Sequence, residues 1–472
     1  MKNTLVLYPT PAIGHLISMV ELGKFILKTY PSFSITILIS TPPYNAGSTT
    51  PYINKVAQTT PIHFHHLPDV TLETFNSPHH ETLTFELLRL NNPLVHQALV
   101  TISQTSNIKA LVMDMFCAIA LQVSNELNIP TYFFYTSGLA ALALLLYFPT
   151  LHQTYTQHFK DLKNTLLDVP AGIPSILATD MPKPMLDRND KAYEQFLYCT
   201  MNMPKAQGII VNSFDSLEPR ALKALRDGLC VKNGSTPPLY CMGPLIADRD
   251  GNKGSGAVVH ECLSWLDEQP SRSVVFLCFG SLGLFSEAQI KEIAIGLEKS
   301  EQRFLWVVRS PPTDDKNKRF LAPPEPDLDV LLPQGFLDRT KDRGLVVKSW
   351  APQVEVLGRE SVGGFVSHCG WNSVLEAVCA GVPMVAWPLY AEQRINRVFL
   401  VEELKLALPM VENEDGFVSA GEIEKRVKQL MDSEEGKVIR EQALRMCEGA
   451  KAALSEGGSS LRALNELVEL LK

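Results

Sequence analysis

Short apolar runs alternate with longer stretches of helical periodicity from the start of the chain. In the first half, the apolar runs predict strands at 4–8, 34–40, 61–66, 109–113, 130–135 and 207–212. The stretches between them predict helices at 16–28, 82–105, 117–127 and 138–150. Strands that alternate with helices predict a parallel sheet with helices on both faces, joined by right-handed crossovers.

This alternation stops at a polar, glycine-rich segment, residues 243–259, which we interpret as a linker. It then restarts, with further strands predicted at 273–279, 303–308, 344–348, 362–366 and 383–387. The C-terminal part is helical in pattern, and Gly457-Gly458 interrupts it, so that a final helix at 459–471 can return to the first domain. The pattern therefore predicts an α/β protein of two domains, 1–242 and 260–455, with a returning segment at 456–472.

Length and composition limit the classes of function. A chain of 472 residues is too long for one ordinary core, which agrees with two domains. The net charge is −8, and no basic run stands out, so we expect neither nucleic acid nor an anionic membrane as a partner. Nine scattered cysteines without a C-x-x-C pair favour reduced thiols in the cytoplasm. The N-terminus lacks a signal-peptide pattern, and the longest apolar run, 139–148, is too short to span a bilayer.

The segment that follows the strand at 362–366 suits a phosphate group. The strand leads into Ser-His-Cys-Gly-Trp-Asn-Ser at 367–373, where a helix is expected to begin. A helix start presents free backbone N–H groups and the positive end of the helix dipole, which favour an anion. His368, Asn372 and Ser373 add side-chain donors at the same place.

Residues on either side of this helix start suit the other parts of a nucleotide sugar. Glu376, one helical turn later, offers two oxygens to the vicinal hydroxyls of a ribose. Trp350 follows a predicted strand and offers a ring on which a base can stack. Glu392 and Gln393 offer acceptors and donors that suit a ring of hydroxyls. Base, ribose, diphosphate and sugar thus each find a matching group between residues 350 and 393.

These 44 residues resemble the nucleotide-sugar box of the plant UDP-dependent glycosyltransferases of family 1. The match runs through Trp-Ala-Pro-Gln at 350–353, His-Cys-Gly-Trp-Asn-Ser at 368–373, Glu376, Gly-Val-Pro at 381–383, Trp-Pro at 387–388 and Glu-Gln at 392–393. The resemblance implies the GT-B architecture, in which two Rossmann-like domains face each other across a cleft. It also implies that the first domain binds the acceptor and the second binds the UDP-sugar.

The resemblance assigns residues to each part of the donor. Trp350 stacks on uracil, and the backbone of Ala351 reads the edge of the base. The box ends in Gln393, which implies glucose, and Trp371 supplies no cation for the carboxylate of a glucuronic acid, so UDP-glucose is the expected donor. The predicted donor-binding residues are Thr136, Ser281, Trp350, Ala351, Gln353, His368, Trp371, Asn372, Ser373, Glu376, Tyr390, Glu392 and Gln393.

The candidate catalytic residues lie in the first domain. His15 occurs where the first strand gives way to its helix, and Asp114 follows the fourth strand. A histidine at a helix start is often only a solvated or capping residue. Here a carboxylate on one ring nitrogen can fix the tautomer, so that the other nitrogen takes a proton from an acceptor hydroxyl. The resemblance implies the same roles, a base at His15 and its partner at Asp114.

Two further positions come from strand ends. Ser281 lies in the turn Phe-Gly-Ser-Leu-Gly at 279–283, whose glycines allow a phosphate to approach the backbone. Thr136 follows the fifth strand, and two interpretations stay open for it: contact with the sugar or a phosphate, or capping of the helix that begins near Gly138. The side chains that could face a flat aromatic acceptor, although each is more often core, are those of Phe116, Tyr193, Phe196 and Tyr390.

Three other classes share parts of the pattern. A metal-dependent transferase holds a divalent cation with Asp-x-Asp, but the matches at 327–329 and 248–250 lie in a Pro-rich insert and in the linker, as solvated loop charges do. A nicotinamide oxidoreductase needs G-x-G-x-x-G after a strand, and none occurs. A non-catalytic nucleotide-sugar-binding protein would not need the pair His15 and Asp114.

We therefore predict an inverting, metal-independent glycosyltransferase that moves glucose from UDP-glucose to a hydroxyl of a small, flavonoid-like phenolic acceptor. The UDP-sugar is a substrate, so no cofactor is expected. Attack by a phenol ring carbon, or transfer to a terpenoid or hormone, stays open because the acceptor-pocket residues are scattered over loops. We expect a cytoplasmic monomer.

Overall fold

The computed structural model describes residues 1–472 except 45–48, 73–78, 233, 248–259, 314 and 316–320. The chain divides into two compact units. One comprises Met1–Ile246 and Ala452–Lys472, and the other comprises Ala247–Lys451. Most of the predicted linker falls on 248–259 and therefore lies outside the described residues.

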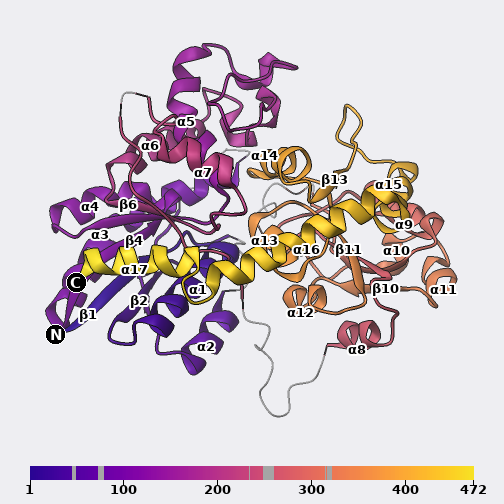
Figure 1. The fold of residues 1–472 in the computed structure, drawn as a ribbon, viewed down its shortest axis with the longest axis horizontal. Helices are drawn as coiled ribbons and strands as arrows, with labels where there is room; N and C mark the ends of the chain where they lie inside the picture. Colours follow the sequence, from indigo (N-terminus) through magenta and orange to yellow (C-terminus); the bar gives the residue numbers. More distant parts are fainter. Residues whose placement is uncertain (45–48, 73–78, 233, 248–259, 314, 316–320) are drawn as a thin grey trace. The chain divides into compact units, whose positions relative to one another are not determined.

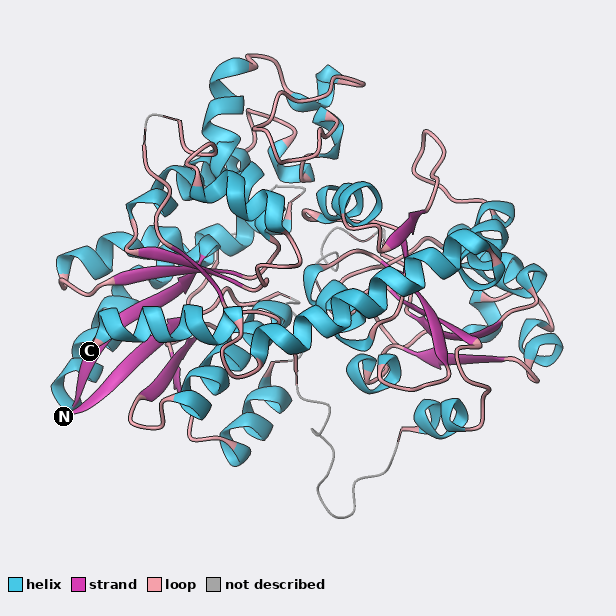
Figure 2. Ribbon diagram, viewed as in Figure 1, coloured by secondary structure: helices cyan, strands magenta, loops and turns pink. Residues whose placement is uncertain are grey.

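The first unit is built on a parallel sheet (Figures 1 and 2). Its strands are β1 (Lys2–Tyr8), β2 (Ser34–Ile39), β3 (His63–His66), β4 (Ser106–Asp114), β5 (Thr131–Tyr135), β6 (Gly208–Val211) and β7 (Leu239–Cys241). They lie in the order β3-β2-β1-β4-β5-β6-β7, and every neighbouring pair is parallel. The chain moves outward from β1 to β3 and then crosses back to β4 on the other side of β1. The carboxyl ends of β1 and β4 therefore form the switch point at which such sheets bind ligands.

Helices cover both faces of this sheet. The α-helices of the unit are α1 (Ile13–Thr29), α2 (Thr50–Thr59), α3 (His80–Thr105), α4 (Leu121–Glu126), α5 (Leu139–Thr154), α6 (Lys191–Asn202), α7 (Pro219–Arg226) and α17 (Ser459–Leu471). Because the crossovers are right-handed, the reversal of direction after β3 places α1 and α2 on one face and α3 to α5 on the other.

The C-terminal helix α17 belongs to the face that carries α1. Its residues Leu464, Leu467, Val468 and Leu471 are buried in the same cluster as apolar side chains of β1, β4 and α1. The hydroxyl of Tyr30, at the end of α1, also donates a hydrogen bond to Asn465 Oδ1 at 2.7 Å. The end of the chain thus completes the core of the first unit.

The second unit repeats the design with a parallel sheet of its own (Figures 1 and 2). Its strands are β8 (Val274–Cys278), β9 (Arg303–Val308), β10 (Gly344–Lys348), β11 (Val362–Ser367), β12 (Met384–Ala386) and β13 (Ala407–Pro409). They lie in the order β10-β9-β8-β11-β12-β13, all in parallel. The direction reverses between β8 and β11, so the switch point lies at the carboxyl ends of these two strands.

The helices of the second unit bury its sheet in the same way. They are α8 (Glu261–Asp267), α9 (Glu287–Ser300), α10 (Leu328–Leu331), α11 (Phe336–Thr340), α12 (Gln353–Leu357), α13 (Trp371–Ala380), α14 (Gln393–Val398), α15 (Ala420–Asp432) and α16 (Glu434–Leu454). One core cluster joins Val275 and Leu277 of β8 to Trp306 of β9, Ile293 of α9 and Ile423 of α15.

Several elements differ from the sequence-based expectation. Strands β7 and β13, of three residues each, were not predicted from the sequence. The helix expected at 117–127 is instead a 3₁₀ turn at Met115–Ala120 followed by the short α4. The turn forms because the side chain of Asp114 accepts a hydrogen bond from the backbone N–H of Phe116. The insert expected to be a loop contains α10, whose first turn is capped by the carboxylate of Asp327.

Candidate active site

His15 and Asp114 meet at the switch point of the first unit. His15 lies in the first turn of α1, directly after β1, and Asp114 is the last residue of β4. The Nδ1 atom of His15 lies 2.6 Å from Oδ2 of Asp114. Asp114 is fully buried, whereas 29% of the His15 side chain is exposed. The pair thus combines a partly exposed imidazole with a buried carboxylate.

The carboxylate of Asp114 is held by further donors. Its Oδ1 accepts hydrogen bonds from the hydroxyl of Thr10 at 2.7 Å and from the backbone N–H of Phe116 at 3.0 Å. With the carboxylate fixed as an acceptor, Nδ1 of His15 carries the proton, and Nε2 is left as the basic nitrogen. Thr10 was not predicted from the sequence. Its position in the loop after β1 is the only signal by which the sequence could have indicated it.

Thr136 lies beside the same imidazole. Its hydroxyl is 3.2 Å from Nδ1 of His15. The start of α5 is satisfied by another residue, because the buried carboxylate of Glu218 accepts the N–H groups of Leu139 and Ala140. The interpretation of Thr136 as a helix cap is therefore wrong, while its contact with a sugar or phosphate stays a prediction.

An aromatic cluster adjoins His15. The ring of Phe116 lies 5.8 Å from the imidazole, in an edge-on arrangement at 82°. Phe85 and Phe196 pack on Phe116 at 5.2 and 5.5 Å between ring centroids. Of the three side chains of this unit predicted to face an acceptor, Tyr193 and Phe196 are buried and Phe116 is partly exposed. The first unit thus offers apolar ring surface next to its partly exposed histidine.

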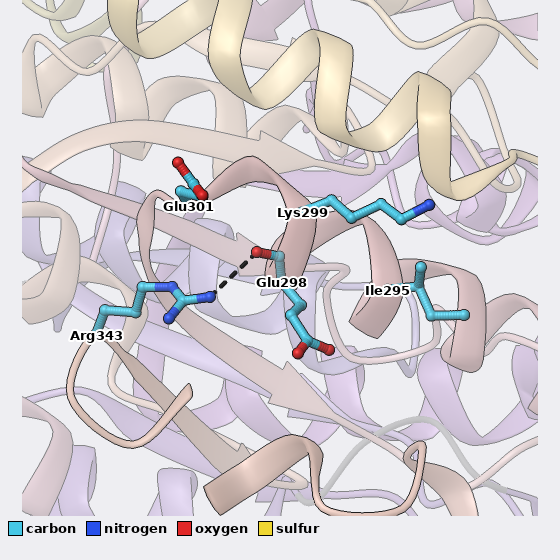
Figure 3. A pocket seen from close by; sticks show the side chains of 5 residues that line it. All are labelled: Ile295, Glu298, Lys299, Glu301 and Arg343. Atoms are coloured by element: carbon cyan, nitrogen blue, oxygen red, sulfur yellow. Dashed lines mark hydrogen bonds between the residues drawn. The ribbon is translucent and has the colours of Figure 1, made fainter. Parts of the chain in front are cut away.

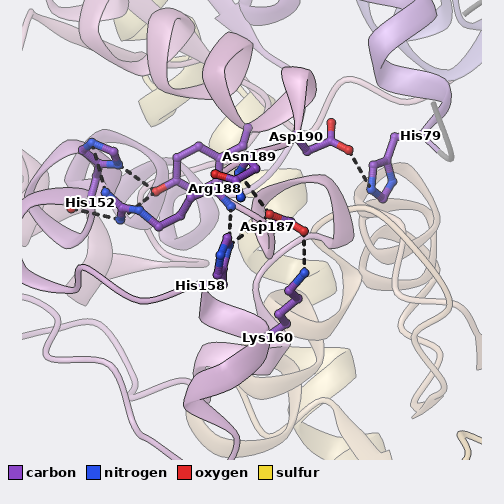
Figure 4. A network of polar contacts seen from close by, with 9 residues as sticks. His79, His152, His158, Lys160, Asp187, Arg188, Asn189 and Asp190 are labelled. Carbon is purple, nitrogen blue, oxygen red and sulfur yellow. Dashed lines mark hydrogen bonds and ion pairs between the residues drawn. The ribbon is translucent and has the colours of Figure 1, made fainter. Parts of the chain in front are cut away.

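A polar network fixes the segment that leads to α6 (Figure 4). Arg188 donates hydrogen bonds to the backbone oxygens of His152, at 3.1 Å, and Tyr155, at 2.7 Å. The hydroxyl of Tyr193 lies 2.8 Å from Nδ1 of His152. Asp187 pairs with Lys160. These contacts join the end of α5 to the start of α6, the helix that carries Phe196.

In the second unit, His368 is enclosed by glycine backbone at the switch point. A Cβ atom built on Gly280, which follows β8 and has a φ of +73°, would lie 2.5 Å from Nε2 of His368. A Cβ on Gly370 would lie 2.4 Å from the same atom. Neither position can therefore carry a side chain unless the imidazole moves. The burial of His368 lowers its pKa to about 4, so the ring is neutral near pH 7. It offers hydrogen bonding at this place rather than positive charge.

The predicted residues of the helix start are joined in one network. Helix α13 begins at Trp371. Its N-cap residue is Gly370, so no N-cap side chain accepts a hydrogen bond from the backbone N–H groups of the first turn. The amide of Gln353 donates to the hydroxyl of Ser373 at 2.8 Å and to Oε2 of Glu376 at 2.6 Å. Burial is the main cause that raises the pKa of Glu376 to about 7, and the hydrogen bond from Gln353 opposes it. Asn372 is half-buried in the same helical turn.

Trp350 and Ala351 follow β10 and differ in exposure. The indole of Trp350 is 64% exposed and touches the ring of His260 only edge-on, at 5.9 Å and 70°. Ala351 is buried. An aromatic ring this exposed is available as a stacking partner for a base.

At the end of the box, the oxygen of Gln393 is committed to the backbone. Oε1 accepts hydrogen bonds from the N–H groups of Leu389 and Tyr390, at 2.9 and 3.0 Å. What Gln393 can offer to a ligand is therefore its amide N–H groups, whereas the sequence suggested acceptors as well. Glu392 is half-buried at the start of α14. The ring of Tyr390 lies 5.9 Å from that of His368.

Ser281 is exposed in the turn after β8, and a residue missed by the sequence analysis supports that turn. Arg309, directly after β9, donates to the backbone oxygen of Gly280 at 3.3 Å and also to that of Ser281. A lone arginine at the end of an apolar run carries no motif, so only the structure reveals this contact.

A different pocket of the second unit lies away from these residues (Figure 3). It is open, measures about 630 Å³, and is lined by Ile295, Glu298, Lys299, Glu301 and Arg343. Glu301 and Arg343 precede β9 and β10, so the pocket lies at the amino ends of the strands. The residues of the predicted site lie instead at the carboxyl ends of the strands, where open α/β sheets bind their ligands.

In the part of the chain that the structure describes, no group of three or more His, Cys, Asp or Glu side chains is arranged to hold a metal ion. The Asp-x-Asp match at 248–250 lies outside the described residues. No helix among the described residues is long and apolar enough to cross a membrane.

Comparisons with known proteins agree with this geometry. The family model described as UDP-glucoronosyl and UDP-glucosyl transferase matches residues 250–447. UDP-glycosyltransferase 88B1 of Stevia rebaudiana is 54% identical over 463 residues, which cover 97% of this chain and 96% of the relative. Anthocyanidin 5,3-O-glucosyltransferase of a Rosa hybrid cultivar is 52% identical over 487 residues, which cover 100% and 99%. This chain belongs to the UDP-glycosyltransferase family.

A solved structure extends the likeness of this glycosyltransferase to the fold. Phytolacca americana UGT2 complexed with UDP-2fluoro-glucose and pterostilbene matches with a TM-score of 0.87 and 37% identity, covering 99% of each chain. Together with the two parallel Rossmann-like sheets, this confirms the predicted GT-B fold class. The hypotheses of a nicotinamide oxidoreductase and of a non-catalytic binding protein are wrong, because the relatives are named as glycosyltransferases.

The close approach of Gly280 to His368 yields a test of the donor site of this glycosyltransferase. We expect Gly280→Ala to push the imidazole away and to weaken UDP binding by at least about tenfold, measured by calorimetry. Gly416→Ala is the matched control, because Gly416 has a similar φ of +78° but no atom within 4 Å of an added Cβ. Equal UDP affinities in the two variants would show that His368 does not need its present position.

Proposed function

We propose that this glycosyltransferase is an inverting enzyme that transfers glucose from UDP-glucose to a hydroxyl of a small phenolic acceptor, without a metal ion. The observation that carries the proposal is the 2.6 Å contact between His15 and Asp114 beside the ring of Phe116. The first unit supplies the base and binds the acceptor, and the second unit binds the donor.

In the reaction, Nε2 of His15 takes the proton of the acceptor hydroxyl. The imidazolium that forms is stabilised by the buried carboxylate of Asp114, which stays ionised. The acceptor oxygen attacks the anomeric carbon as the bond to the diphosphate breaks on the opposite side, so the configuration inverts. UDP leaves with the bonding electron pair, and the proton ends on His15 before it passes to solvent.

The donor is held by the groups gathered at the carboxyl ends of the second sheet. Trp350 stacks on uracil, and Glu376 accepts the ribose hydroxyls. The leaving diphosphate is stabilised by the start of α13, with Asn372 and Ser373, and by Ser281. These donors need no cation to act, and Asp327 of the Asp-x-Asp match already caps α10.

A phenolic acceptor suits the rings beside the base. Phe116 is partly exposed, and the buried rings of Phe85 and Phe196 pack behind it, so its ring can pack against a flat aromatic acceptor. The relative from the Rosa hybrid cultivar is named for an anthocyanidin acceptor, and the Phytolacca americana structure is a complex with pterostilbene. Both compounds carry phenolic hydroxyls on aromatic rings, which are acidic enough for a histidine to assist their deprotonation.

The proposal is tested by incubating the protein with UDP-glucose and a panel of phenolics, with and without EDTA. We expect glucosides that mild acid hydrolyses, formed equally in EDTA. An acid-resistant product would instead show transfer to a ring carbon, and loss of activity in EDTA would contradict metal independence. His15→Ala should lower kcat by about a thousandfold or more while UDP affinity, measured by calorimetry, stays unchanged. Activity retained by this variant would contradict the role of His15 as the base.

The raised pKa of Glu376 predicts a pH dependence of nucleoside binding. The carboxylate that accepts two ribose hydroxyls is populated above its pKa of about 7 and is lost as the pH falls through that value. Uridine affinity should therefore fall about tenfold from pH 8 to pH 6. Uridine is used because, unlike UDP, it has no phosphate that titrates in this range. Glu376→Gln should bind weakly at both pH values, and a flat profile for the wild type would contradict the ribose role.

A further inference from the structure

Arg309 directly follows β9, the neighbour of β8, at the same edge of the sheet as the predicted donor site. Its guanidinium donates hydrogen bonds to two successive backbone oxygens, those of Gly280 and Ser281. These two residues form the turn that follows β8 at the switch point. Arg309 thus holds the backbone of this turn at Gly280 and Ser281.

The environment of Arg309 is unusual for a cation. The side chain is half-buried, and the loss of hydration lowers the pKa of its guanidinium, an effect that the nearby Tyr390 and Cys278 oppose. In the described part of the chain, no ion pair joins Arg309 to a carboxylate. The guanidinium of Arg309 therefore donates to neutral carbonyl groups, next to the proposed diphosphate site. This environment favours a functional role for Arg309.

The turn needs support from outside. Gly280 has a φ of +73° and no side chain, and Ser281 is exposed, so neither residue anchors the backbone by packing. In a trans peptide the C=O and the following N–H point in opposite directions. When Arg309 draws the carbonyls of Gly280 and Ser281 to one side, the N–H groups of Ser281 and Leu282 point to the other. The N–H of Leu282 meets the hydroxyl of Tyr390 there.

We propose that Arg309 is a positioning residue for the donor: by fixing the two carbonyls, it aims the N–H and hydroxyl of Ser281 at the diphosphate of UDP-glucose. This inference rests on the proposed function. Arg309 acts through the turn, so it should affect ligands that contain the diphosphate and leave the binding of the nucleoside part unchanged.

The test compares UDP with uridine as calorimetric ligands of the wild type, Arg309→Met and Arg309→Lys. We expect Arg309→Met to bind UDP about tenfold more weakly than the wild type and to bind uridine equally well. Arg309→Lys should lie between them, because lysine keeps the charge and can donate to a carbonyl, but its shorter side chain does not place a nitrogen where Nη1 of Arg309 meets both oxygens. In kinetics, the KM for UDP-glucose should rise while kcat changes little. Arg303→Met, at the other end of β9, is the control for the loss of a cation from this strand and should bind both ligands as the wild type does.

Four outcomes would overturn the inference. If both Arg309 variants bind UDP as the wild type does, the turn does not need Arg309. If UDP and uridine weaken by the same factor, the role of Arg309 is only structural. If the Arg309→Met protein does not fold, the UDP-to-uridine ratio of Arg309→Lys decides, and an unchanged ratio refutes the inference. Failure of the wild type to bind UDP would refute the proposed function and, with it, this inference. This failure is distinguished from the others because it is observed with the wild type alone, without any variant.

Discussion

The hydrogen bond between His15 and Asp114 is the contact on which the proposed chemistry depends. A buried carboxylate is costly unless donors surround it, and here Thr10 and the backbone of Phe116 complete its coordination. The same donors prevent the carboxylate from turning away from the imidazole. The pair therefore has one arrangement, in which Nδ1 is protonated and Nε2 is the nitrogen that we propose as the base.

The topology explains why these residues meet. His15 and Asp114 are far apart in sequence, but His15 begins the helix after β1 and Asp114 ends β4, the two strands between which the first sheet reverses its order. The second sheet reverses between β8 and β11, and there the imidazole of His368 fills the space that Gly280 and Gly370 leave open. The same geometric rule thus places the proposed base in one unit and the proposed diphosphate-binding residues in the other.

The α/β fold and most of the candidate donor site could be predicted from the sequence, because the strand periodicity and the box at 350–393 each involve many residues. Isolated contacts were not legible. Thr10 and Arg309 act through single hydrogen-bonded side chains that no motif marks. The link from Gln353 to Glu376 joins two helices, α12 and α13, whose approach depends on packing. The aromatic cluster beside His15 draws on α3, the 3₁₀ turn at Met115–Ala120 and α6, and these side chains come together only in the fold.

The most direct test of the account is the turnover of Asp114→Asn with UDP-glucose and a phenolic acceptor. The amide keeps the shape of the carboxylate but favours the wrong tautomer of His15 and cannot stabilise the imidazolium. We predict that kcat falls by about a thousandfold or more while UDP affinity is unchanged. A variant that keeps most of its turnover would contradict the claim that the buried carboxylate makes His15 the base.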